Sequence, residues 1–432
     1  MSKEEASSGN TMELVQAGLA RRYAKERRFR FFGRLAVAIA LASLAFLFVD
    51  IALKGYSAFY QTSIRLSIEL SLDELGISAS PSHEELLGAD WDRVIRLALT
   101  ERFSEVSNRK ERRKLSRLMG SAAGYQLRDM VIKDLTMLGE RHTVWLLAHS
   151  KVDAFLKETE DAISVAESPL LGASEIKWLQ SLMTDGDVEF RFNSNFFTMG
   201  DSRDPESAGI LSSLVGSLFM LAVTLLLSFP IGAAAAIYLE EFAPRSRITD
   251  LIEVNINNLA AVPSITFGLL GLAIFIQFFG MPRSAPLVGG IVLTLLTLPT
   301  IIIASRASIK AVPPSIREAA LGVGASQMQT VMHHVLPNAL PGMLTGTIIG
   351  MARALGETAP LIMIGMVAFI VEVPTGITDP SSALPVQIYL WSDSPERGFV
   401  ALTSAAILVL MIFLIAMNGF AVYLRRKLEK RW

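Results

Sequence analysis

Six stretches of this chain are long and apolar enough to cross a lipid bilayer, and they constrain the fold more than any other feature. They lie near residues 32 to 53, 208 to 232, 257 to 280, 286 to 305, 342 to 371 and 399 to 424. A helix needs about 20 mostly apolar residues to span the hydrocarbon core of a bilayer. The sequence therefore predicts an all-α polytopic membrane protein with six transmembrane helices.

The distribution of Lys and Arg predicts the orientation of these helices, because short cytoplasmic segments carry an excess of basic residues. Basic clusters lie in two tails, residues 1–31 and 425–432, and the cluster of the first tail extends to Arg34. Both ends are therefore expected in the cytoplasm. Two ends on the same side require an even number of spans, which agrees with the six predicted here. A signal peptide would have small residues at a cleavage site after its apolar stretch, but here the charged residues Asp50 and Lys54 occupy that place. We accordingly expect a retained anchor over residues 32–53.

The polar region at residues 54–206 is predicted to be an inserted, extracytoplasmic α+β domain. The whole chain is 51% hydrophobic with a mean hydropathy of +0.42, so part of it must lie in water. Ser82 and Glu85 have the capping-box spacing that begins a helix. The run of charged residues at 109–117 is interpreted as the solvated face of a helix; the alternative is a docking surface. Alternating polarity predicts half-buried strands at Ile64, Leu66, Ile68 and Leu70, and at Val188, Phe190 and Phe192.

Composition argues against several classes of function. The net charge of -1 is unlike that of general nucleic-acid binders, which need excess basic charge. The chain has five His and no Cys, so options for a metal site are few. It also lacks the Gly-x-x-x-x-Gly-Lys-Ser/Thr phosphate loop. We therefore predict a protein that is not an enzyme, has no catalytic residue and binds neither a metal nor a cofactor; any ATP and Mg would be used by a partner chain.

The segment between the fourth and fifth predicted spans, residues 306–341, has the pattern of two short helices. Ser315 with Glu318 and Ser326 with Gln329 have capping-box spacings. Gly322 and Gly324 can adopt the positive φ that ends the first helix, and Pro337 and Pro341 restrict the chain before the next span. Apolar side chains are expected to be exposed on this loop and to bind a partner protein, namely Ala319, Ala320, Leu321, Val331, Met332 and Val335.

This loop resembles the cytoplasmic signature of permease subunits of ATP-binding-cassette (ABC) importers. The signature reads Glu-Ala-Ala, three residues, Gly, nine residues, Ile, any residue, Leu-Pro, and His334 stands here at the Ile position. The resemblance implies a permease domain at residues 207–424 with five of the spans, and a loop that couples it to a separate ATPase. The alternative is an incidental amphipathic hairpin. The matching, ATPase-coupling positions are Glu318, Ala319, Ala320, Gly324, Leu336 and Pro337.

A charged pair lies in the fifth predicted span, where Arg353 and Glu357 are one helical turn apart. An Arg at the centre of a membrane helix costs roughly 2.5 to 3.5 kcal/mol on insertion scales, so the pair is expected to line a path or to be bound to a partner. Pro360 lacks an amide hydrogen and would leave the carbonyl of Gly356 open. We predict that Arg353, Glu357 and Thr358 form a substrate path or gate for an anion. The alternative is an ion pair that only locks two helices together.

Small residues recur every four positions beside this pair and predict a face on which another helix packs closely. They are Gly342, Gly346, Gly350 and Ala354.

The run Arg-Ala-Leu-Gly-Glu-Thr-Ala-Pro at 353–360 resembles that of PstA-type permeases of phosphate ABC importers, and the likeness extends from about Leu211 to the C-terminus. It implies a phosphate permease of the bacterial inner membrane with an N-terminal extracytoplasmic extension. Its implied partners are a sister permease (PstC-like), an ATPase dimer (PstB-like) and a periplasmic phosphate-binding protein (PstS-like). Two alternatives stay open: a permease for another oxyanion, such as molybdate or sulfate, and a membrane sensor that uses the outside domain.

Overall fold

The computed structural model describes residues 3–428 apart from 79, 160–167 and 368. The chain divides into two compact units, residues 1–53 and 54–432. The first unit is the greater part of one long helix, α1 (Lys3–Tyr56), which contains an apolar stretch long enough to span a membrane. Lys430 and Arg431 of the predicted basic tail lie outside the described residues.

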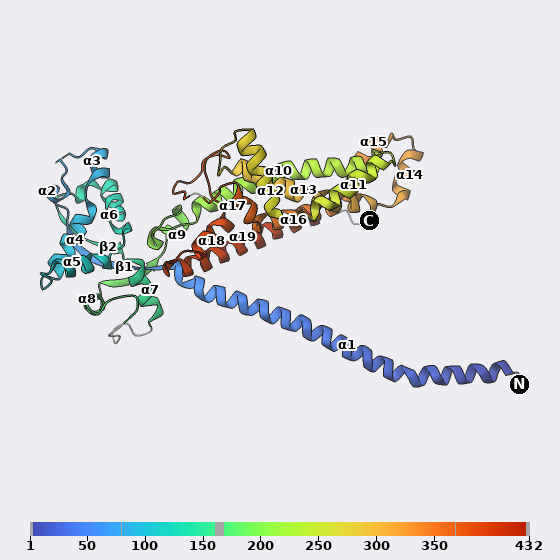
Figure 1. The fold of residues 1–432 in the computed structure, drawn as a ribbon, viewed down its shortest axis with the longest axis horizontal. Coiled ribbons are helices and arrows are strands. Elements are labelled where there is room, and N and C mark those ends of the chain that lie inside the picture. Colours follow the sequence, from blue (N-terminus) through green and yellow to red (C-terminus); the bar gives the residue numbers. More distant parts are fainter. Residues whose placement is uncertain (1–2, 79, 160–167, 368, 429–432) are drawn as a thin grey trace. The chain divides into compact units, whose positions relative to one another are not determined.

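Residues 54–206, here called the inserted domain, form a three-stranded antiparallel sheet with short helices packed on it (Figure 1). The central strand β1 (Tyr60–Glu69) pairs with β2 (Arg141–Leu147) on one side and with β3 (Val188–Phe192) on the other. The two predicted strands are confirmed as β1 and β3, but only β1 is half-buried; Phe190 and Phe192 of β3 are exposed. Strand β2 was missed because its sequence, Arg-His-Thr-Val-Trp-Leu-Leu, does not alternate between polar and apolar residues.

The helices of the inserted domain cover the sheet and close a single apolar core, in which Leu99, Leu127, Phe155 and Leu179 are fully buried. Burial of such side chains is the main favourable contribution to the stability of the domain. The helices are α2 (Leu72–Leu75), α3 (His83–Gly88), α4 (Trp91–Arg102), α5 (Arg109–Leu115), α6 (Ala122–Lys133), α7 (Ser150–Glu158), α8 (Ala173–Thr184) and α9 (Asn195–Thr198).

The predicted cap at the start of α3 is half correct. Ser82 accepts a hydrogen bond from the amide of Glu85 at 3.2 Å, but the Glu85 carboxylate accepts from Ser78 and does not close the box. Helix α3 is short, and Asp90 begins the next helix, α4, by accepting from the amide of Arg93 at 2.9 Å.

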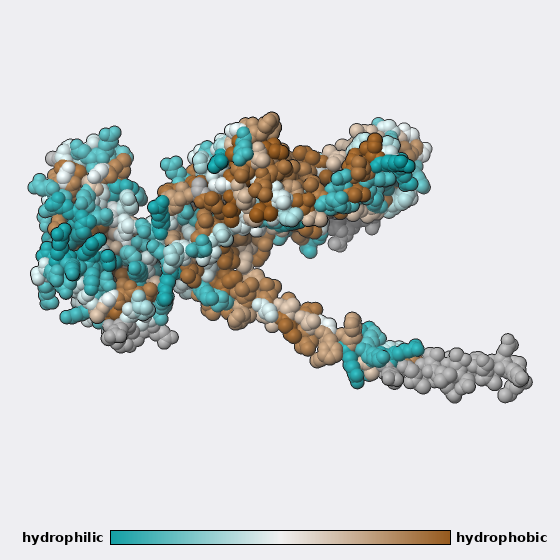
Figure 2. All heavy atoms as spheres, viewed as in Figure 1, coloured by the Kyte–Doolittle hydropathy of each residue, from teal (hydrophilic) through white to brown (hydrophobic). Residues whose placement is uncertain are grey.

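Residues 207–428 form a helical bundle whose long helices are apolar over most of their surface (Figure 2). Three of the helices carry π-helical turns at 238–242, 272–278 and 331–335. The helices are α10 (Leu211–Ile237), α11 (Arg247–Ala260), α12 (Ser264–Gly271), α13 (Pro286–Lys310), α14 (Pro314–Gly322), α15 (Gln327–Thr330), α16 (Leu336–Gly356), α17 (Ala359–Met363), α18 (Leu384–Ser392) and α19 (Gly398–Leu428).

Among the described residues, five helical segments are long and apolar enough to span a membrane, or six if the bent pair α11–α12 counts as one. The predicted third span falls on that pair, which bends by 100° next to Pro263. The predicted fifth span at 342–371 is wrong in its bounds. The helical segment there runs from Gln327 to Gly356 and ends four residues before Pro360, because Pro cannot donate the hydrogen bond that would continue the helix. Pro341 lies inside this helix and does not end it.

The predicted small-residue face of α16 packs against α13. A Cβ atom on Gly342 would lie 2.4 Å from the hydroxyl of Ser308, and one on Gly346 would lie 2.2 Å from the Cβ of Ala304. Side chains larger than hydrogen would therefore separate the two helices. This close approach fixes the position of α16 and of the segment that follows it.

Candidate functional site

The first short helix of the 306–341 loop, α14, begins differently from the prediction. Pro313 occupies the N-cap position and Pro314 the first helical position, where a missing amide hydrogen costs nothing. The predicted capping pair Ser315–Glu318 is therefore wrong. Gly322 is the last residue of α14, and Gly324, with a φ of +90°, allows the turn that follows.

The second short helix, α15, begins as predicted. The Ser326 hydroxyl accepts from the Gln329 amide at 3.3 Å, and the Gln329 side chain accepts from the Ser326 amide at 2.9 Å. This reciprocal capping box holds α15 in place after the turn.

The two helices present an apolar surface that differs in part from the predicted one. Leu321 and Met332 are exposed, as expected, whereas Ala320, Val331 and Val335 are buried. Two exposed residues were missed: Val323, which is 87% exposed, and Met328, which is 60% exposed. We call Leu321, Val323, Met328 and Met332 the apolar tip. Exposed side chains of this size on a short hairpin are typical of a surface that binds a partner.

The predicted coupling residues occupy distinct positions on this hairpin. Glu318 and Ala319 are exposed on α14, and no hydrogen bond or ion pair is found for Glu318 within the described part of the chain. Leu336 and Pro337 are half-buried at the start of α16. The side chain of Glu318 is thus available to a partner, whereas Leu336 and Pro337 connect the hairpin to the long helix.

Arg317 anchors the hairpin to the bundle. Its guanidinium contacts the carboxylate of Glu241 twice, with Nη2 and Nε 2.7 and 3.1 Å from Oε1. It also donates to the carbonyl oxygens of Ile309 and Val312, at 2.9 and 2.7 Å, at the end of α13. Gln327 of α15 donates to the carbonyl oxygen of Glu241. One side chain therefore joins α14 to the ends of both α10 and α13.

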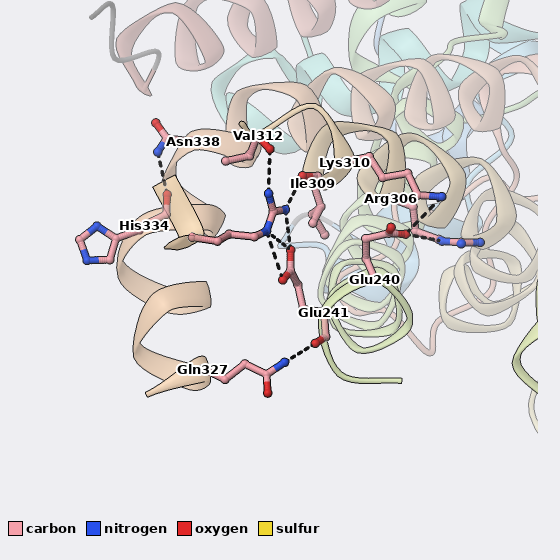
Figure 3. A network of polar contacts seen from close by, with 10 residues as sticks. Glu240, Glu241, Arg306, Ile309, Lys310, Val312, Gln327, His334 and Asn338 are labelled. Carbon is pink, nitrogen blue, oxygen red and sulfur yellow. Dashed lines mark hydrogen bonds and ion pairs between the residues drawn. The ribbon is translucent and has the colours of Figure 1, made fainter. Parts of the chain in front are cut away.

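A second ion-pair network lies beside the first. Arg306 of α13 contacts Glu240 at 3.2 Å, and Lys310 contacts the same carboxylate at 3.6 Å (Figure 3). Arg306 also contacts Glu253 of α11 at 2.9 Å. The side chains of Arg306 and Glu240 are only 14% and 16% exposed. Removing one partner of such a pair leaves a poorly solvated charge, which is more costly than losing the contact alone.

Sequence reasoning missed these networks. A signal was present, because Glu240 and Glu241 directly follow a long apolar run, and Arg317 directly precedes Glu318. Which basic residue meets which acid depends on the packing of α10, α11 and α13.

The predicted charged pair is formed, but not within one helix. Arg353 Nε lies 3.4 Å from Glu357 Oε1. Helix α16 ends at Gly356, Glu357 is extended with a ψ of 124°, and Thr358 precedes the short helix α17. The pair therefore sits at a helix break, where Gly268 of α12 packs closely on the backbone of Pro360. Irregular backbone at membrane depth is tolerated where it is buried in protein or lines an aqueous cavity.

The two members of this pair differ in exposure. The Arg353 side chain is 45% exposed, and that of Glu357 is 17% exposed. Ile349, one turn before Arg353, is also exposed, so this strip of α16 faces away from the contact with α13. An exposed guanidinium held at one edge by a carboxylate keeps donors free for an oxyanion.

Comparisons with known proteins bear on the two parts of the chain. Residues 16–165 match a domain of unknown function, and residues 228–430 match the model described as binding-protein-dependent transport system inner membrane component. The phosphate transport system permease protein PstA of Mycobacterium leprae is 32% identical over 223 residues, which cover 51% of this chain and 71% of that protein. This chain belongs to the PstA family of ABC importer permeases.

A second PstA protein, from Haemophilus influenzae, is 29% identical over 254 residues, covering 59% of this chain and 88% of that protein. Among solved structures, an inward-facing MetNI methionine ABC transporter aligns with 51% of this chain and 97% of its own, with 19% identity and a TM-score of 0.41. The predicted fold class, a helical ABC permease with an inserted α+β domain, is confirmed. As a PstA-family permease, the chain is an integral inner-membrane transport subunit.

Proposed function

We propose that this chain is the permease subunit of an ATP-driven importer of inorganic phosphate. The observation that carries the proposal is the similarity to two proteins named phosphate transport system permease PstA, at 29% and 32% identity. The proposed partners are a PstC-like sister permease that completes the translocation path, a PstB-like ATPase dimer that uses ATP and Mg, and a periplasmic PstS-like phosphate-binding protein.

The proposed orientation places both termini in the cytoplasm and the inserted domain in the periplasm. It rests on the basic residues at both ends of the chain and on the Lys and Arg that follow α10 and α13. The apolar tip and the ion-pair networks of Arg306 and Arg317 then lie on the cytoplasmic side, where the ATPase subunit would dock.

In the proposed coupling mechanism, the apolar tip and Glu318 bind the ATPase, and Arg317 transmits the displacement. When the ATPase subunits close, α14 moves with them, and the bidentate contact to Glu241 pulls the end of α10 in the same direction. A half-buried Arg with several hydrogen bonds resists displacement because each lost hydrogen bond to a charged group costs about 1.5 to 3 kcal/mol. The hairpin and α10 would therefore move as one body.

In the proposed transport path, Arg353 binds or gates phosphate at the helix break, and Glu357 orients it. The guanidinium offers several donors that match phosphate oxygens, and a carboxylate beside it limits how tightly the anion is held. Thr358 lies next to Glu357 and supplies a hydroxyl at the same break.

Uptake of radiolabelled phosphate tests this function directly. Cells depleted of this chain should lose uptake, and wild-type chain should restore it. Arg353→Gln should fail to restore uptake although the complex assembles, whereas Arg283→Gln, at an exposed loop position, serves as a matched control. Equal inhibition of uptake by excess molybdate or sulfate would favour another oxyanion. Loss of assembly in Arg353→Gln would show that the ion pair only locks helices.

The coupling assignment is tested by Glu318→Leu. We expect ATP hydrolysis to continue while phosphate uptake is lost, with normal amounts of the chain in the membrane. Glu84→Leu, at an exposed position on α3, is the control. Unchanged uptake with Glu318→Leu would contradict the assignment.

A further inference from the structure

A groove on the inserted domain is lined by five arginines and by no Asp or Glu. Arg93 and Arg96 come from α4, and Arg109, Arg112 and Arg113 from α5, around a cavity of about 530 Å³. Figure 2 shows strongly hydrophilic side chains over these two helices. The volume falls within the range of about 300 to 1,000 Å³ that is usual for ligand pockets.

Only part of this positive charge is neutralised from outside the groove. Arg93 pairs with Glu74 at 2.7 Å and Arg96 with Asp90 at 3.2 Å. Within the described residues, Arg109, Arg112 and Arg113 have no carboxylate at ion-pair distance, and Arg112 donates only to the carbonyl oxygen of Val106, at 3.0 Å. Three guanidiniums thus face the groove without a counterion.

Helix α5 is also unfavourable by itself because of repulsion between its own charges. Its sequence is Arg-Lys-Glu-Arg-Arg-Lys-Leu, and it places Arg109 above Arg113 and Lys110 above Lys114, each four residues apart. Like charges at this spacing destabilise a helix by a few tenths of a kcal/mol per pair. An anion bound in the groove would reduce the repulsion between Arg109 and Arg113, which both line it.

A second arginine-lined cavity in the same domain shows how the charges are balanced where no ligand is needed. Arg65, Arg102 and Arg141 line about 560 Å³ together with Glu101 and Asp187. Arg65 pairs with Asp187 at 2.8 Å, Arg141 pairs with Glu101 at 2.9 Å, and Arg102 pairs with Asp185. Arg109, Arg112 and Arg113 of the first groove lack this compensation, so the two cavities differ in the balance of charge along their linings.

We infer that the α4–α5 groove is a binding site for a polyvalent phosphoryl anion. Guanidiniums bind phosphoryl oxygens through paired hydrogen bonds, and a chain of phosphoryl groups carries several charges along a short length, as three unpaired arginines require. Buried Leu99 and Leu115 also line the groove. This site is separate from the proposed transport path at Arg353, so each can fail without the other.

Calorimetric titration of the full-length chain in phosphatidylcholine nanodiscs with tripolyphosphate tests this inference. We expect binding that weakens as salt is raised, because the attraction is electrostatic. The double variant Arg109→Gln/Arg113→Gln should bind at least about tenfold more weakly, since losing a hydrogen bond to a charged group costs about 1.5 to 3 kcal/mol. Gln retains helix propensity, and circular dichroism would verify that the domain is folded.

Two controls and two competing ligands decide the outcome. Arg109→Lys/Arg113→Lys, which keeps the charge, should bind more tightly than the Gln variant, and Arg141→Gln, in the balanced cavity, should bind as the wild type does. Tighter binding of tripolyphosphate than of short-chain cardiolipin, whose headgroup carries two phosphodiesters, identifies a free anion as the ligand, and the reverse identifies a lipid headgroup; either supports a polyvalent phosphoryl site. Equal binding of poly-glutamate, or no change in the Gln variant, would overturn the inference.

Discussion

Glu206 is a buried carboxyl in the short segment that joins the inserted domain to α10, and its neutralisation should stabilise the protein. The side chain is only 6% exposed, and its Oε2 has no hydrogen-bond partner within the described residues. It packs against Gly120, where a Cβ would lie 2.6 Å from Glu206 Oε1. Burial, together with the nearby charge of Asp204, raises the pKa of Glu206 to about 7.

The size and sign of the effect follow from this pKa. A rise from 4.5 to about 7 makes ionisation of Glu206 cost about 3 kcal/mol in the folded state, at about 1.4 kcal/mol per tenfold change in proton affinity. Because the folded state holds the proton more tightly than the unfolded state, stability is greatest below the unfolded pKa. It falls as the pH rises through 4.5 to about 7, and it is then constant as far as this group is concerned.

Glu206→Gln should therefore remove this pH dependence and raise stability mainly above pH 7. For a domain of this size, about 3 kcal/mol corresponds to a Tm increase of about 6 to 12 °C, an upper value because the new amide must also be satisfied. The assay is thermal unfolding of the full chain in nanodiscs from acidic to alkaline pH, followed by tryptophan fluorescence of the inserted domain. Glu189→Gln, on the exposed strand β3, is the control. Parallel pH profiles for wild type and Glu206→Gln would refute the reasoning.

Three further perturbations have expected outcomes. Arg317→Ala should lower the free energy of unfolding by about 2 kcal/mol and uncouple ATP hydrolysis from phosphate uptake. A double-mutant cycle with Glu241→Ala should give a favourable coupling energy. Additive effects of the two substitutions would show that the contact transmits nothing. Gly346→Val should reduce the amount of folded chain in the membrane, because there is no space for a Cβ against α13, whereas Gly419→Val, in open space, should not. Leu179→Ala, fully buried in the inserted domain, should cost about 2 to 5 kcal/mol in thermal unfolding; a shift of less than about 1 kcal/mol would mean that this core is not well packed.

Much of the fold could be predicted because its signals are local. An apolar run marks a membrane helix wherever it occurs, and alternation over Ile64–Leu70 marks a half-buried strand without knowledge of its partner. The capping pair Ser326–Gln329 is likewise a contact between residues three apart. Errors arose where two local rules competed. At α14, Pro314 at the first helical position determined the helix start, so Ser315 could not be the cap.

Less of the candidate site could be predicted, because its contacts join distant parts of the chain. Arg317 and Glu241 are 76 residues apart, and Arg306 and Glu253 are 53 apart. Nothing in the spacing of these residues specifies which acid each Arg meets. Burial is equally hard to predict: Ala320 and Val331 appear in the sequence as part of an exposed apolar surface, yet both are buried.

By itself, the sequence determined that this chain is a membrane permease with an inserted α+β domain, and it predicted the short hairpin at residues 306–341, because hydrophobic length, charge bias and motif spacing are properties of short segments. Only the tertiary structure decided that Arg317 joins the hairpin to α10, that Glu357 lies at a helix break, that Glu206 is desolvated, and that the arginines of α4 and α5 share one groove. Each of these depends on which surfaces meet when the chain packs, and the free energy of a charge depends on its neighbours in space.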